Sequence, residues 1–344
     1  MGPWHLLFMI ASYSAILVCL YAVYRIGVER GWQWGAIHLI ILGAFYVLFW
    51  LMESWAAIRT PYYVYPPAFP DVVGYYPWNT NPVVNLCAFN TPTDDGIPRA
   101  VLFLETALVF AAMHTAMLLT PIRRFRLLRP FMAALALLGL DLFLDPLASW
   151  SFECMTIGSP SQLGLGFWHW HVLPALGPDG FGIPLFNYAV WYAAPVVLIA
   201  LVGLVSWFYD LAFPPIHTSQ SGQMVLVIVI DMVFLAIIIF GFGIIIAFSP
   251  NFNDIPIYWL RLIFAAILVA TLIAIVVFWK SYKFDNDFRW WFVYPQVVFL
   301  VFGVIALIGS GAIASVPYLW VVALVVTLLF LLWSISPYIK RIWP

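Results

Sequence analysis

The sequence predicts an all-α integral membrane protein, a polytopic bundle of about nine transmembrane helices. Of its 344 residues, 65% are hydrophobic and only 8% are charged, and the mean hydropathy is +1.01. A soluble domain of this length cannot bury so much apolar surface. The apolar runs are also about 20 residues long, which matches the hydrocarbon layer for a helix, and they lack the alternation of barrel strands.

We interpret the chain as one transmembrane domain, residues 1–344, with a core near 34–207 and additional C-terminal helices within 223–338. The first apolar stretch has no basic segment before it and no small-residue cleavage pattern, so we expect a retained helix rather than a signal peptide. The nine expected helices lie near residues 3–25, 34–57, 99–120, 131–149, 183–207, 223–247, 258–279, 291–311 and 317–338.

The distribution of Lys and Arg predicts an N-terminus outside and a C-terminus inside, because cytoplasmic loops carry the excess of these residues. Three cations are then outside, Arg59, Arg99 and Arg261. The inner side holds Arg25, Arg30, Arg123, Arg124, Arg126, Arg129, Lys280, Lys283, Arg289, Lys340 and Arg341. The expected location is the cytoplasmic membrane of a prokaryote.

Two expected outer loops, 58–98 and 150–182, are long and rich in Pro, Gly, Tyr and Trp. Such loops more often cap a cavity or lie in the interface than act as spacers, although an aromatic belt explains part of their composition. Each is followed by the string GIP, at 96–98 and 182–184, which we expect to open the next helix because proline is favoured in the first turn. Either an internal duplication or chance explains the similarity between the two segments.

Five acidic residues are expected within the membrane. Glu53, Glu105, Asp141 and Asp145 fall in the outer half, and Asp231 lies deeper. A carboxylate at mid-membrane costs about 2.5 to 3.5 kcal/mol on insertion scales, so each one needs a partner, a cavity or a neutral form.

Asp141 and Asp145 are four residues apart, so both face one side of a helix. Two like charges in a dry place cannot comfortably both ionise, which keeps a proton on one of them. Pro146 is expected to stop this helix and to leave the carbonyl of Leu142 free, because proline has no N–H.

A structural role for these acids is the alternative. Asp141 and Asp145 would then bind loop amides, or Arg59 and Arg99, and hold loops to helices. For Glu105, a structural role and a catalytic role are about equally favoured. Asp231 is expected to be structural, with His114 as its partner.

We expect no bound metal and no cofactor. His169 and His171 are two residues apart with no third ligand in reach, and His38 and His114 would suit haem only if they faced each other. The cysteines form no CxxC pair, although Cys87 could bond to another loop cysteine, Cys154. The net charge of −1 and the lack of a phosphate-binding loop argue against nucleic acid as a partner.

The stretch LDLFLDPLASW at 140–150, followed by GFWHW and GFGIPLFNYAVW, resembles the signature of the membrane carotenoid-biosynthesis family that includes the bacterioruberin and γ-carotene hydratases. The matching positions are Asp141, Asp145, Pro146, Trp168, Trp170, Gly182, Pro184, Leu185, Asn187 and Trp191. The specific match covers about 50 residues, and a looser likeness includes Glu53 and TPYYVY at 60–65. Ala189 and Val190 depart from the pattern, in which a glycine often precedes the tryptophan.

The resemblance implies addition of water across the terminal double bond of an acyclic carotenoid, taken from the bilayer. Protonation of such an alkene gives a tertiary carbocation, which needs an acid held neutral in a dry site and electron-rich rings around the cation. We assign Asp145 as the acid, Asp141 as its partner, and Glu53 or Glu105 as the base that positions water. The residues expected to bind substrate are Trp168, Trp170, Asn187, Tyr188 and Trp191. No redox cofactor is required.

Three other classes stay open. A carotenoid or terpene cyclase would begin with the same protonation, but an internal alkene would quench the cation. A transporter would also carry membrane carboxylates, distributed through both leaflets. A non-catalytic subunit would bind carotenoid within a larger membrane assembly.

Overall fold

The computed structural model describes residues 2–59, 63–65, 70–74, 96–119, 129–149, 167–170, 185–212, 289–311, 321 and 324–325. Within these residues, the helices are α1 Pro3–Arg30, α2 Trp32–Arg59, α3 Arg99–Leu119, α4 Arg129–Ser149, α5 Leu185–Ala212 and α8 Trp290–Gly309. The mostly helical fold is therefore confirmed. The expected helices at 223–247 and 258–279 lie outside the described residues, as does most of the one at 317–338.

Five of the described helices are long and apolar enough to cross a membrane. They are α1, α2, α3, α4 and α8. In α5 the apolar stretch is shorter and covers Val190–Gly203. Large apolar side chains point outward on α1 and α8, among them Leu17 and Ile308, as expected for helices that face lipid. The chain thus has the helices of a membrane protein.

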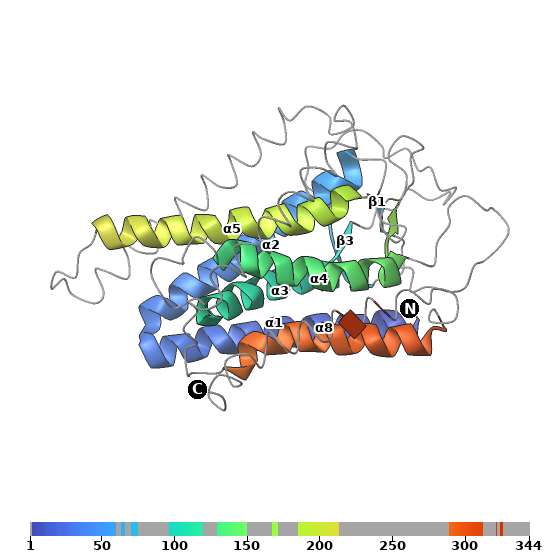
Figure 1. Cartoon of the computed structure of the whole chain (residues 1–344), viewed down its shortest axis with the longest axis horizontal. Helices are drawn as coiled ribbons and strands as arrows, with labels where there is room; N and C mark the ends of the chain where they lie inside the picture. Colours follow the sequence, from blue (N-terminus) through green and yellow to red (C-terminus); the bar gives the residue numbers. More distant parts are fainter. Residues whose placement is uncertain are drawn as a thin grey trace.

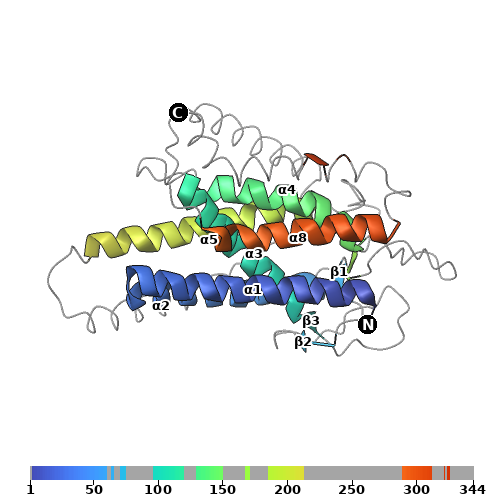
Figure 2. The same cartoon turned by 90° about the horizontal axis from the view of Figure 1, so that it is seen from below.

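Helix α3 lies at the centre of the described bundle, because α1, α2, α4 and α8 all pack against it (Figures 1 and 2). Helices α1 and α8 run antiparallel. The ring of Tyr21, late in α1, stacks on Trp290 at the start of α8, and Trp4 at the other end of α1 lies against Gly309. Although α8 belongs to the C-terminal part of the chain, it is built into the same core as α1 and α3.

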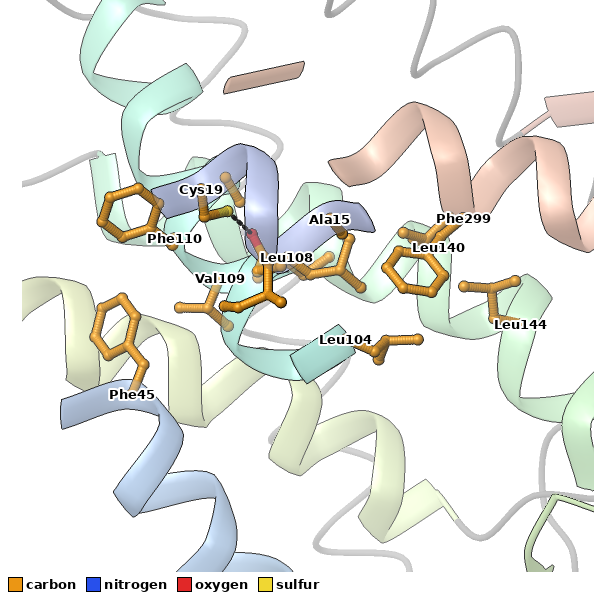
Figure 3. Packing of buried hydrophobic residues seen from close by; sticks show 14 of the residues in the cluster. Ala15, Cys19, Phe45, Leu104, Leu108, Val109, Phe110, Leu140, Leu144 and Phe299 are labelled. Carbon is orange, nitrogen blue, oxygen red and sulfur yellow. Dashed lines mark hydrogen bonds between the residues drawn. The ribbon is translucent and has the colours of Figure 1, made fainter. Parts of the chain in front are cut away.

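The contact between α1 and α3 depends on small side chains. Ala11, Ala15, Cys19 and Ala22 recur every three or four residues on one face of α1, and all four are buried. Small residues let membrane helices approach closely. The Cys19 Sγ consequently reaches the carbonyl oxygen of Ala107 on α3, at 3.8 Å (Figure 3). Larger side chains of α2, α3, α4 and α8 fill the space around this contact, as Figure 3 shows.

Two prolines behave differently from the sequence prediction. Helix α4 continues through Pro146 to Ser149, so Pro146 does not stop it. The helix can extend past this residue because proline removes a single backbone N–H from the helical hydrogen bonds. Pro98 lies outside the first turn of α3, in a two-residue strand, and the helix begins at Arg99.

Two short antiparallel strand pairs lie at one end of the bundle. Strand β1 (Tyr63–Val64) pairs with β4 (His169–Trp170). This pairing joins the two expected outer loops. Strand β2 (Val72–Val73) pairs with β3 (Ile97–Pro98). Gly96, just before β3, has φ +85°, and a Cβ there would overlap the carbonyl oxygen of Val73, so only glycine fits.

Candidate functional site

The two acids of α4 are buried where this helix packs against α5. Asp141 is 7% exposed and Asp145 is 2% exposed. They lie one helical turn apart, as their spacing predicts, and therefore share a face of α4. Ala134 and Leu138 continue the same face toward the other end and pack against α5.

Asn187 joins the two acids from α5. Its Nδ2 donates to Oδ2 of Asp145 at 2.5 Å and to Oδ2 of Asp141 at 3.1 Å. Asn187 lies in the first turn of α5, whereas the acids lie near the end of α4, so antiparallel packing of these helices brings them together. The amide is itself buried, at 8% exposed.

Trp168 completes this group from the segment that follows α4. Its indole Nε1 donates to Oδ1 of Asp145 at 2.6 Å, and the residue is 8% exposed. The backbone N–H of the preceding residue, Phe167, donates to the carbonyl of Ala148 at 3.1 Å, which fixes the chain next to the end of α4. Each oxygen of Asp145 thus accepts a short N–H hydrogen bond.

A second pair of acids lies beside the first. Glu105 of α3 is 4% exposed and its side chain is within hydrogen-bonding reach of Glu53 on α2. Glu53 accepts a hydrogen bond from the hydroxyl of Tyr65, from its Oη to Oε2, at 2.6 Å. The Oε2 of Glu105 is buried and accepts no hydrogen bond from any described residue.

Glu53, Glu105, Asp141 and Asp145 form one group, which we call the acid cluster. Asp141 is close enough to repel Asp145 and Glu53, and Glu105 is close enough to repel Asp141. Within the described part of the chain, neither Asp141 nor Glu105 contacts a cationic side chain. Uncompensated buried charges are costly, so the cluster must carry at least one proton.

The other expected site residues lie nearby with different surroundings. Tyr188 is buried between α5 and α4, packed with Ala134, Leu138 and Tyr192. Trp191 is partly buried against the main core. The backbone of Trp170 pairs with that of Tyr63 in the β1–β4 ladder, and its side chain lies outside the described residues.

Of the two arginines considered as structural partners of the α4 acids, Arg59 has its side chain outside the described part of the chain, and Arg99 has another partner. Arg99 pairs with Asp71 at 3.2 Å, and the hydroxyl of Tyr13 donates to the same carboxylate. The rings of His38 and His114 stack on each other at 5.0 Å, with 27° between their planes.

Asp231, Cys87, Cys154 and His171 lie outside the described residues. Among the residues that the structure describes, no group of three His, Cys, Asp or Glu side chains could hold a metal ion.

Sequence reasoning missed Tyr65 and an aromatic group next to Trp168. Phe8 of α1 packs against both Phe167 and Trp168, with ring centroids 4.7 and 6.3 Å apart, and Phe167 stacks on Phe302 of α8 at 6.1 Å. Tyr65 and Phe167 fall within the quoted motifs TPYYVY and GFWHW, which could have indicated them. Phe8 and Phe302 lie in apolar runs, where no pattern distinguishes them.

Comparison with known proteins adds no relative to this geometry: the chain matches no family model, no curated protein and no solved structure.

Proposed function

We propose that this chain is a membrane enzyme that adds water across the terminal double bond of an acyclic carotenoid. One observation supports this most directly. Asp141, Asp145, Trp168 and Asn187, four positions of the motif that resembles the carotenoid hydratases, form one buried hydrogen-bonded group. They are separated by up to 46 residues in the chain, so their contact is a property of the fold.

The reaction needs an acid, a water molecule and a base. A proton from the acid cluster forms a C–H bond with the terminal alkene, and the double bond opens to a tertiary carbocation. The oxygen of water then bonds to this carbon, and a carboxylate takes the proton that water releases. The net change is alkene plus water to tertiary alcohol, without oxidation or reduction.

The surroundings of the cluster suit a cationic intermediate derived from an apolar substrate. The indole of Trp168 lies directly against Asp145, and aromatic rings from α1 and α8 lie behind it. Aromatic faces stabilise cations when water is excluded. A carotenoid dissolved in the bilayer can approach between helices, so the chain needs no soluble domain to extract it.

Pigment analysis in a lycopene-producing bacterium tests the proposal. We expect the wild-type chain to give a product heavier by one water molecule, and Asp145→Asn to abolish it. Glu29→Gln is the matched control, because Glu29 is paired with Arg25 and Arg289 and lies one residue from the end of α1, at the opposite end of this helix from the Trp168 group. A new product of unchanged mass would instead indicate a cyclase.

Two other results would contradict the proposal. Pigment that copurifies with the wild-type chain without turnover would favour a carotenoid-binding subunit. Unchanged hydroxylated product from Asp145→Asn would remove Asp145 from the reaction.

We further propose nine spans with the N-terminus outside, in the cytoplasmic membrane of a prokaryote. Glu29 near the end of α1 binds both Arg25 of α1 and Arg289 just before α8, at 2.7 and 2.6 Å. These two arginines therefore lie at one end of the bundle, and the strand pairs of the loops lie at the other. This separation fits an arginine-rich inner side.

A further inference from the structure

We infer that the exchangeable proton of the acid cluster resides on Glu105, shared with Glu53, and that Asp145 is held as a carboxylate. For the proposed hydration, Glu105 then supplies the proton and Asp145 accepts the proton from water. This reverses the roles expected from the sequence, in which Asp145 is the acid. The roles depend on the proposed function, whereas the location of the proton does not.

The hydrogen bonds of Asp145 are those of an ionised group. Its Oδ1 accepts from the indole of Trp168 at 2.6 Å, and its Oδ2 accepts from the amide of Asn187 at 2.5 Å. Neither donor can accept a hydrogen bond from a carboxylic acid at the nitrogen concerned. Short N–H bonds to both oxygens stabilise the charged form in the resting state, and each oxygen keeps a second lone pair that can take up a proton.

The hydrogen bonds of the glutamates indicate the opposite state. Two carboxyl groups within hydrogen-bonding reach need a proton between them, because an ionised carboxylate has no donor. Glu53 accepts a hydrogen bond from the Tyr65 hydroxyl, which stabilises its ionised form, so of the two glutamates Glu105 is the one that carries the proton. Glu105 is 4% exposed and its Oε2 accepts no hydrogen bond from a described residue, so a charge there would lack stabilisation.

Asp141 lies between the ionised Asp145 and the protonated glutamate pair. It interacts with Asp145 on its own helix, with Glu105 on α3 and with Glu53 on α2. After the hydration, the proton on Asp145 must return to the glutamates to restore the starting state. Asp141 is the group placed to pass it on, so one catalytic cycle consumes one alkene and one water and leaves the cluster unchanged.

Infrared spectroscopy of the full-length protein in phosphatidylcholine vesicles locates the proton without any carotenoid. A protonated carboxyl group absorbs apart from carboxylates and amides, and its band shifts in heavy water. At neutral pH we expect such a band in the wild-type protein, its loss in Glu105→Gln, and its retention in Asp145→Asn. Glu29→Gln should retain it, because Glu29 is paired with two arginines.

Isotope labelling gives the same answer without a substitution, should Glu105→Gln fail to fold. Wild-type protein with carbon-13 in the glutamate side-chain carboxyls should show a shifted component of the band. Carbon-13 in the aspartate carboxyls should leave that component in place.

The opposite pattern overturns the inference. A band that persists in Glu105→Gln and disappears in Asp145→Asn, or a band that shifts only with labelled aspartate, places the proton on the α4 pair. Absence of the band from the wild-type protein overturns it as well. The spectra are independent of product formation, so a chain that makes no hydroxylated carotenoid can still show the glutamate band.

Discussion

Replacing Asn187 by leucine tests whether its amide holds the two acids of α4 together. Leucine keeps nearly the same volume but cannot donate to Asp145 at 2.5 Å or to Asp141 at 3.1 Å. A hydrogen bond to a charged group contributes about 1.5 to 3 kcal/mol, and the longer of the two bonds contributes less. We therefore expect Asn187→Leu to lower the free energy of unfolding by about 3 kcal/mol, roughly a 100-fold change in the folding equilibrium.

The loss can be measured by unfolding the protein in mixed micelles with increasing sodium dodecyl sulfate. A double-mutant cycle with Asp145→Leu isolates the shorter bond. In the Asp145→Leu background, Asn187→Leu should cost less by about 1.5 to 3 kcal/mol.

Gln296→Leu is the matched control, because this amide is 2% exposed and neither its Oε1 nor its Nε2 has a hydrogen-bond partner among the described residues. Its replacement should leave stability unchanged or increase it. If the two substitutions at Asn187 and Asp145 are additive within about 0.5 kcal/mol, the amide does not stabilise the acids and the reasoning is wrong.

Two further substitutions probe the loops at the same end of the bundle. Gly96→Ala should lower stability by about 1 to 3 kcal/mol in the same assay, because φ is +85° and the new methyl group would meet Val73, whereas Gly43→Ala should not, since nothing lies within 4 Å of that position. Tyr65→Phe should cost about 1.5 to 3 kcal/mol by removing the hydroxyl that donates to Glu53, and an unchanged unfolding midpoint would contradict the bond.

The six described helices could be predicted because long apolar runs are typical of helices that cross a membrane. Their ends could not be placed so well. The predicted first helix ends at Arg25, where the apolar run stops, but α1 continues to Arg30. It ends where Gly31 takes φ +103° and donates its N–H to the carbonyl of Gly27, which is a local backbone event that hydropathy does not record.

In the candidate site, too, the local features could be predicted from the sequence and the long-range contacts could not. The four-residue spacing of Asp141 and Asp145 was enough to predict a shared face, because helical periodicity is local. The contacts of Asn187 and Trp168 with Asp145 span 42 and 23 residues, and only the motif resemblance suggested that these residues belong together. The approach of Glu105 to Glu53 depends on how α2 and α3 pack, for which the sequence contains no periodic signal.

The two-residue strands were also beyond prediction. Tyr63 and Val64 carry no alternating pattern long enough to distinguish a strand from a loop. Their pairing with His169 and Trp170 joins segments that are far apart in the sequence, which a local pattern cannot indicate.

The packing of α1 against α8 has a consequence for how the protein is made. About 260 residues separate Arg30 from Trp290, so at typical synthesis rates α1 waits roughly 13 to 50 seconds in the bilayer before its neighbour emerges. Phe8, which will touch α8, tolerates lipid in the meantime. Ser14, which will receive the hydroxyl of Tyr294, already donates to the carbonyl of Ala11 within its own helix. Phe8 and Ser14 therefore need no partner from α8 while the rest of the chain is being translated.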